Sequence, residues 1–212
     1  MIDIKILTFS QFQSNCYIVF DHTKEAVIID PGMLDSEENK MLDETVKSND
    51  LKPVKLLLTH GHLDHLFGAA YIKSKYGLLP QMHKKDLPVL QQTRSYALSF
   101  GVEMQEDPPI PEKFIDDEES ICFGDSKLKA IHIPGHSPGS LIFFDKDSSQ
   151  LFAGDVLFNG SIGRTDLPGG DHASLIRGID EKLMILPDDV TVYCGHGPAT
   201  TIGKERSENP FL

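Results

Sequence analysis

The chain has 212 residues, of which 40% are hydrophobic and 25% charged, with a formal net charge of -12 at neutral pH. This composition is typical of a globular protein and excludes a fibrous or largely disordered chain. The acidic balance argues against a nucleic-acid or anionic-membrane partner, because phosphate binding requires clustered lysine and arginine.

The remaining global features indicate a cytoplasmic protein. The N-terminal stretch MIDIKILTFS mixes charged and apolar residues and does not have the pattern of a secretory signal. The apolar runs are shorter than a membrane-spanning segment. Three widely spaced cysteines fit a reducing compartment better than a disulfide framework. We expect a single domain over residues 1–212, because domains of this length are common.

Hydrophobic patterning predicts strands and helices that alternate along most of the chain. In the first half, strands are expected at 2–9, 15–21, 25–30, 54–59 and 78–84, and helices at 35–48, 63–76 and 86–100. In the second half, strands are expected at 126–134, 140–145, 150–155 and 190–195, and a helix at 172–185. Apart from its expected helix, the region 85–119 is the least patterned.

Four of the expected strands end in glycine-containing turns that carry histidine or aspartate. The four segments are LLLTHGHLDH (56–65), AIHIPGHSPG (130–139), LFAGD (151–155) and TVYCGHG (191–197). In α/β sheets, ligands gather beyond the carboxyl ends of strands. We therefore expect these turns to meet at one site.

The four turns supply five imidazoles and two carboxylates as candidate metal ligands: His60, His62, Asp64, His65, His136, Asp155 and His196. They are too many for one tetrahedral zinc ion but suit two divalent ions that share a water. Imidazole and carboxylate donors without thiolate favour Zn, with Fe and Mn as alternatives. A helix N-terminus capped by Asp64 would account for only one of the four candidates at 60–65.

These motifs resemble those of the metallo-β-lactamase superfamily, whose H-x-H-x-D-H signature corresponds to residues 60–65. The later motifs follow in the same order, as PGHSPGS (134–140), FAGD (152–155) and YCGHGPATT (193–201). Within the superfamily the chain is most similar to glyoxalase II, the hydroxyacylglutathione hydrolases, of the short bacterial type. The resemblance implies an α/β protein folded as a four-layer αββα sandwich, with the site at one edge.

The resemblance also implies a ligand set and a reaction. One metal ion would bind His60, His62 and His136, and the other Asp64, His65 and His196, with Asp155 bridging them. The implied enzyme is a binuclear hydrolase that cleaves a thioester, S-lactoylglutathione or a related hydroxyacylglutathione, by a metal-bridged hydroxide, with Asp64 and Asp155 as catalytic residues. The chain stops soon after His196, so the C-terminal helical segment that helps to bind glutathione in longer glyoxalase II enzymes is expected to be absent, which leaves the thiol carrier open.

A second interpretation is a persulfide dioxygenase, an oxidoreductase related to glyoxalase II. Those enzymes resemble the chain in the H-x-H-x-D-H signature and in the sequence G-R-T-D, here 163–166. They use a single iron held by two histidines and one carboxylate, which would be His60, His136 and Asp155. The motifs alone do not separate this interpretation from a thioesterase.

Two further residues each have two open interpretations. Arg164 is expected either to clamp a substrate carboxylate or to form an ion pair with Asp166 that fixes its loop. Asp30, which ends the segment VIID, is expected either to orient a metal-bound histidine or to cap its own turn.

Overall fold

Two six-stranded sheets pack face to face in the computed structural model, which describes residues 1–104 and 106–212. In the first sheet the strands follow chain order: β1 (Asp3–Phe9), β2 (Ser14–Phe20), β3 (Glu25–Ile29), β4 (Lys52–Leu57), β5 (Pro80–Met82) and β6 (Lys113–Phe114). In spatial order, the second contains β14 (Thr200–Thr201), β13 (Thr191–Cys194), β10 (Gln150–Gly154), β9 (Leu141–Asp145), β8 (Ser126–His132) and β7 (Ser120–Phe123). A small ribbon is formed by β11 (Leu157–Phe158) and β12 (Ser161–Ile162).

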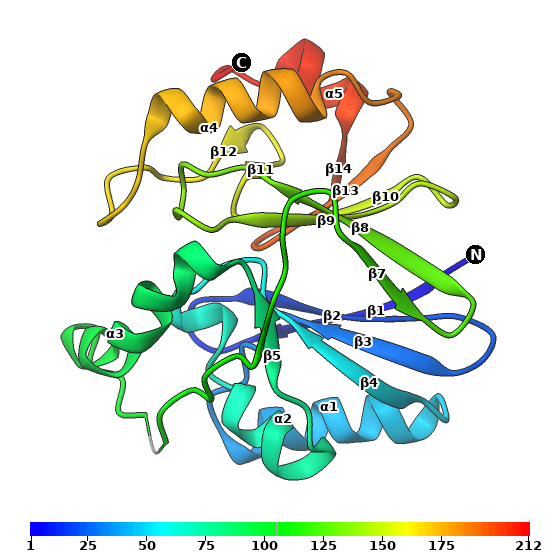
Figure 1. The fold of residues 1–212 in the computed structure, drawn as a ribbon, viewed down its shortest axis with the longest axis vertical. Helices are drawn as coiled ribbons and strands as arrows, with labels where there is room; N and C mark the ends of the chain where they lie inside the picture. The colour runs from blue at the N-terminus through cyan, green and yellow to red at the C-terminus, as the bar shows by residue number, and fades with distance from the viewer. Residues whose placement is uncertain (105) are drawn as a thin grey trace.

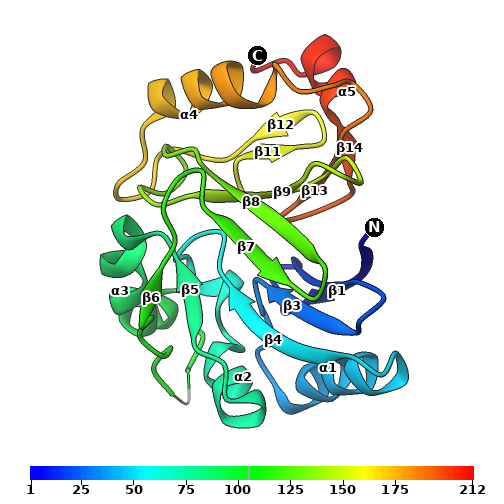
Figure 2. The same cartoon turned by 45° about the vertical axis from the view of Figure 1, so that its right-hand side comes forward.

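Helices cover the outer faces of both sheets, as Figure 1 shows. On the side of the first sheet lie α1 (Ser36–Ser48), α2 (Ala69–Tyr76) and α3 (Leu87–Ser99). On the side of the second sheet lie α4 (His172–Gly178) and α5 (Ile202–Glu208). Figure 2 shows α3 beside β5 and β6 at one end of the first sheet. The four-layer αββα sandwich expected from the sequence is confirmed. Among the described residues, each helix is too short or too polar to span a bilayer.

Three layers of buried side chains hold the four layers of backbone together. Strand β2 is buried on both faces, so its alternate residues serve two different layers. Ile18 packs in the core between the first sheet and its helices, whereas Tyr17 and Val19 pack between the two sheets. In β9, Phe143 faces the first sheet, and its neighbour Phe144 faces the helices α4 and α5. Such strands lack the alternation of polar and apolar residues because both faces are covered.

Strand directions bring the polar turns to one edge. In the first sheet β3 is parallel to β4, and in the second β10 is parallel to β13. Asp30 and His60 follow the first pair, and Asp155 and His196 follow the second. A backbone hydrogen bond of 2.7 Å from Leu141 N–H to the carbonyl of Thr59 joins the two sheets beside these turns.

The structure differs from the predicted elements in several places. The helix expected over 63–76 is a 3₁₀ turn, Leu63–His65, followed by α2 from Ala69, and the one expected over 172–185 is α4 followed by the π-helix Ile179–Leu183. The strand expected over 78–84 shortens to β5. Strands β6, β7, β11, β12 and β14 and helix α5 were not predicted. Most of these are two-residue strands, for which a period of two gives no signal.

Candidate metal centre

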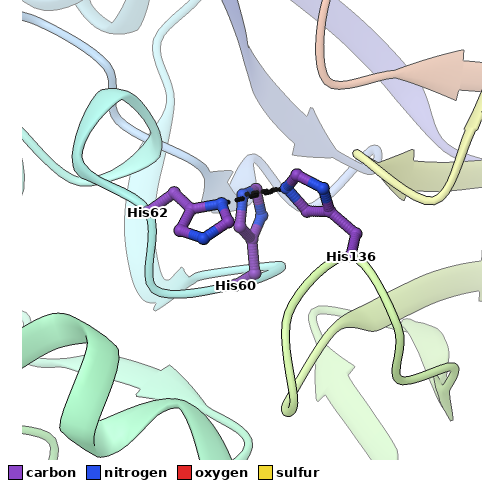
Figure 3. Close-up of side chains that lie close together, drawn as sticks. All are labelled: His60, His62 and His136. Atoms are coloured by element: carbon purple, nitrogen blue, oxygen red, sulfur yellow. Dashed lines mark hydrogen bonds between the residues drawn. The ribbon is translucent and has the colours of Figure 1, made fainter. Parts of the chain in front are cut away.

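The first group of converging side chains is formed by His60, His62 and His136. The Nε2 atom of His136 lies 2.9 Å from Nδ1 of His62 and 3.3 Å from Nε2 of His60. Figure 3 shows the three rings pointing toward one another, although His136 comes from the β8–β9 loop of the other sheet. The donor atoms lie within 4.8 Å of one another, close enough to surround one metal ion. We refer to these residues as the first triad.

The second triad contains Asp64, His65 and His196, whose donor atoms also lie within 4.8 Å of one another. The Nε2 atom of His196 lies 3.2 Å from Nε2 of His65 and 3.2 Å from Oδ2 of Asp64. Because Leu63–His65 is a 3₁₀ turn, the backbone between His62 and His65 is compact enough for neighbouring residues to serve both triads.

Asp155 lies between the two triads. Its Oδ2 atom is 3.4 Å from Nε2 of His136, and its Oδ1 atom is 3.4 Å from Nε2 of His65. The buried Oδ1 forms no hydrogen bond with any residue the structure describes. A buried carboxylate oxygen without a partner is costly, and a bound cation would satisfy it. The donor set therefore fits a divalent metal on each side of this carboxylate.

Two glycines allow the carboxylate of Asp155 to occupy this position. Gly154 has a φ of 49°, in the left-handed region, and turns the chain at the end of β10. Gly195 packs directly against the carboxylate: a Cβ added there would lie 2.0 Å from Oδ1 of Asp155 and 2.9 Å from Cε1 of His65. Any side chain at residue 195 would displace Asp155.

Four of the five histidines have their other ring nitrogen fixed by a neighbouring oxygen. In two of them a side chain is the partner: Nδ1 of His60 lies 3.0 Å from Thr59 Oγ1, and Nδ1 of His65 lies 3.0 Å from Asp30 Oδ2. In the other two a backbone carbonyl is the partner: Nδ1 of His136 lies 2.8 Å from the Arg164 carbonyl, and Nδ1 of His196 lies 3.0 Å from the Phe12 carbonyl. Partners of this kind fix the orientation of metal-binding imidazoles. The contact expected between Asp30 and a histidine of the site is confirmed.

The electrostatics of the site keep most of the donors in the form that binds metal. Burial lowers the pKa of His60 and His62, and neighbouring imidazoles lower it further, to about 4 in His62. Burial raises the pKa of the Asp155 carboxyl, but His65 and other imidazoles outweigh it and hold the pKa well below its usual range. Burial alone would lower the pKa of His65, but the surrounding carboxylates, of which Asp64 has the largest effect, outweigh burial and raise that pKa. Neutral imidazoles and ionised carboxylates are the species that ligate divalent ions.

Asp86 was missed in the sequence. Its fully buried carboxylate accepts hydrogen bonds from the backbone N–H of Gly61 at 2.8 Å, from Ser137 Oγ at 2.6 Å and from the backbone N–H of Gly139. It thereby joins the turn of His60 and His62 to the loop of His136. The only signal in the sequence is an aspartate in the polar segment KKD before α3, which does not distinguish it from a surface residue.

A cavity of about 620 Å³ opens over the two triads. Phe12, Tyr96, Phe100 and Phe158 give it an aromatic wall, and Arg164 lines it as well. The guanidinium of Arg164 forms two hydrogen bonds of 2.7 Å with the carboxylate of Asp166, and its side chain is 62% exposed. The ion pair expected as one interpretation is therefore present, and a role in binding substrate stays a prediction.

All seven candidate ligands thus lie together, and their role as metal ligands stays a prediction. A four-layer αββα sandwich with a cluster of histidines and aspartates at the edge of its sheets defines a class of metal-dependent enzymes. The chain belongs to the metallo-β-lactamase superfamily, whose family model matches residues 10–196.

Relatives of this chain span its full length. The hydroxyacylglutathione hydrolase GloC of Haemophilus influenzae is 39% identical and is aligned over 99% of this chain and 98% of its own. Among solved structures, the BLEG-1 B3 metallo-β-lactamase is 36% identical with a TM-score of 0.89, covering 99% of each chain. The structure of TTHA1623 in a di-iron-bound form is 36% identical with a TM-score of 0.87, covering 98% of this chain and 100% of that one.

Proposed function

We propose that the protein is a metal-dependent thioesterase that hydrolyses S-lactoylglutathione or a related hydroxyacylglutathione. The similarity to the hydroxyacylglutathione hydrolase GloC over nearly all of both chains supports the substrate class. The di-iron-bound form of TTHA1623 supports the use of two metal ions. Three free cysteines suit a reducing compartment, and we propose that the protein acts in the cytoplasm.

The position of Asp155 is the observation that carries this proposal. One carboxylate oxygen faces His65 and the other faces His136, so the same side chain reaches both triads. The first ion would be held by His60, His62 and His136, and the second by Asp64, His65 and His196, with Asp155 between them. We propose zinc as the resident metal, because neutral imidazole and carboxylate are among its preferred ligands.

A pair of divalent ions supplies a water with a pKa near 7 and a positive charge that stabilises a developing oxyanion. The protein contributes the acceptors that orient the water. Asp64 lines the cavity, and although burial raises its pKa, His65 and His196 outweigh it and lower the pKa, so the carboxylate is ionised at neutral pH. An ionised Asp64 accepts a hydrogen bond from the attacking water and directs it toward the carbonyl carbon.

The reaction requires no dedicated general acid. Water that has given up one proton attacks the carbonyl carbon as hydroxide, the C–S bond breaks, and a carboxylic acid and a thiolate are released. The thiolate of a thiol with a pKa of about 8.5 is a good leaving group near neutral pH. The aromatic wall of the cavity gives the substrate an apolar surface to pack against beside the reacting atoms.

The test is hydrolysis of S-lactoylglutathione by purified protein reconstituted with zinc, followed by the loss of the thioester absorbance. We expect turnover that disappears in Asp155→Asn and persists in Asp50→Asn, a matched change of an exposed aspartate. Oxygen uptake on glutathione persulfide by protein that contains a single iron, without thioester cleavage, would instead identify a persulfide dioxygenase and overturn the proposal.

A further inference from the structure

A second cavity of about 280 Å³ adjoins the cavity over the metal centre. The two share His62, Leu63, Tyr96 and Leu167 as lining residues, so they meet beside the first triad. The second cavity lies between the N-terminal half of α3, the turn at Gly61 and the loops that contain Pro138 and Pro168. We call it the side pocket. The functions described above do not use it.

The walls of the side pocket are mainly apolar. Pro88 and Val89 of α3 line one side, and Pro138, Leu167 and Pro168 line the other. Thr93 also lines it, and its hydroxyl donates a hydrogen bond of 3.3 Å to the Val89 carbonyl, so its hydrogen is already used within the helix. Two exposed polar residues complete the lining: Lys85, in the segment before α3, and Gln92 of α3. The apolar walls favour an apolar group, because a polar group packed against them would lose its water without replacement.

The size of the side pocket sets the size of its ligand. A protein cavity of about 150 Å³ lined by apolar residues accommodates benzene, so a pocket roughly twice as large takes about ten carbon atoms. The lactoyl group, with its single methyl, would leave most of the pocket unfilled.

The larger cavity, over the metal centre, is suited to the thiol carrier of a thioester. It is lined by the polar residues Asn159, Ser161 and Arg164 as well as by aromatic rings, and His196 of the second triad faces it. A polar thiol carrier such as glutathione fits there, where its amides and carboxylates keep polar partners or water. His62 lines both cavities, so a substrate whose carbonyl lies at the metal centre extends one end into each.

We propose that the side pocket binds the acyl group of the substrate and selects 2-hydroxyacyl thioesters with a large apolar chain or ring over the lactoyl thioester. This assignment rests on the proposed thioesterase function. Each methylene that is buried against apolar walls contributes about a fourfold gain in binding, which the enzyme expresses in kcat/KM.

The test compares three glutathione thioesters on the zinc-loaded wild-type protein: lactoyl, 2-hydroxyhexanoyl and mandeloyl. We expect kcat/KM to be at least tenfold higher for the 2-hydroxyhexanoyl and mandeloyl compounds than for the lactoyl compound. Val89→Phe, which places a ring in the side pocket, is expected to reduce or reverse this preference. Gln91→Phe, an exposed residue of the same helix that lines neither cavity, should retain the wild-type ratio.

The outcomes separate the two proposals. Cleavage of S-lactoylglutathione with equal or lower activity on the larger thioesters, or a Val89→Phe variant with the wild-type ratio, overturns the side-pocket assignment and leaves the thioesterase in place. Failure to cleave any of the three overturns the thioesterase, and the side-pocket assignment with it. Metal content, measured in each variant, shows that the site is intact; if Val89→Phe does not fold, Val89→Met partly fills the same space.

Discussion

The carboxylate of Asp86 accepts a hydrogen bond from the backbone N–H of Gly61 at 2.8 Å. Its other oxygen accepts one from Ser137 Oγ at 2.6 Å, next to His136. One buried side chain therefore sets the distance between the loops that carry the first triad.

Asp86→Asn is expected to weaken metal binding at the first triad. The amide keeps the size of the side chain, but its NH₂ group cannot accept from the hydrogen-bond donors around it, so one loop must move. Loss of a residue that positions metal ligands without binding the metal itself typically lowers metal affinity 10- to 100-fold. A decrease of about this size is expected for Asp86→Asn. Competition with a chromophoric chelator measures the affinity. The exposed Asp50→Asn serves as the control, and an unchanged affinity in Asp86→Asn would refute the role of Asp86.

Gly195→Ala is expected to abolish metal binding while the fold remains. The added Cβ would lie 2.0 Å from Oδ1 of Asp155, so the carboxylate must leave its position between the triads. Activity is expected to fall by about 100-fold or more, since loss of a group aimed at the reacting atoms commonly costs that much. The control is Gly77→Ala at the end of α2, outside the lining of the cavity over the metal centre, whose added Cβ meets nothing within 4 Å. Its φ of 70° costs some stability, but the variant should retain its metal. A metal-replete Gly195→Ala protein would contradict the assignment of Asp155.

Asp21→Asn is expected to destabilise the protein more at neutral pH than in acid. Burial raises the pKa of Asp21, but hydrogen bonds from Thr23, Asp125 and Ser126 outweigh it and lower the pKa to about 2. A lowered pKa stabilises the fold above the unfolded value of 3.8, and that contribution is lost as the pH falls toward 2. The expected loss is about 1 to 2 kcal/mol at pH 7 after allowance for solvent screening. Urea unfolding of the metal-free wild type and variant at pH 7 and pH 3 measures the difference in their free energies of unfolding. An equal difference at the two pH values would exclude the lowered pKa of Asp21 as its cause.

Removal of metal is expected to lower the melting temperature. A ligand that binds only the folded chain at 100 times its dissociation constant contributes about 2.7 kcal/mol. For a chain of this size that corresponds to a shift of about 5 to 10 °C. Differential scanning calorimetry before and after treatment with a chelator, and after zinc is restored, measures the shift. A melting temperature that does not depend on metal would contradict a metal centre built from both sheets.

Much of the site was predictable because its residues follow strands. His60, Asp155 and His196 each come directly after an apolar run in the sequence, and parallel strands carry the ends of such runs to one edge. The shared position of Asp155 was implied by the family resemblance rather than by the spacing. The layer architecture came from the same resemblance.

The remainder depends on contacts between distant residues. The contact of Asp86 with Ser137 spans 51 positions, and no local pattern marks either residue. The expected helix is interrupted after His65 because Leu66, with φ and ψ of −137° and 5°, leaves the helical region, and α2 begins only at Ala69. The strands β11 and β12 pair with each other and have two residues each, so their segments carry too little periodicity to be recognised.

The central claim is that seven side chains hold two ions on either side of Asp155, and metal stoichiometry tests it most directly. Zinc-loaded wild-type protein, passed through gel filtration and analysed by inductively coupled plasma mass spectrometry, is expected to contain two ions per chain. His62→Ala and His196→Ala are expected to retain about one each, from opposite triads, with loss of thioesterase activity in both. A single ion in the wild type, lost in His62→Ala and retained in full in His196→Ala, would contradict the two-ion centre.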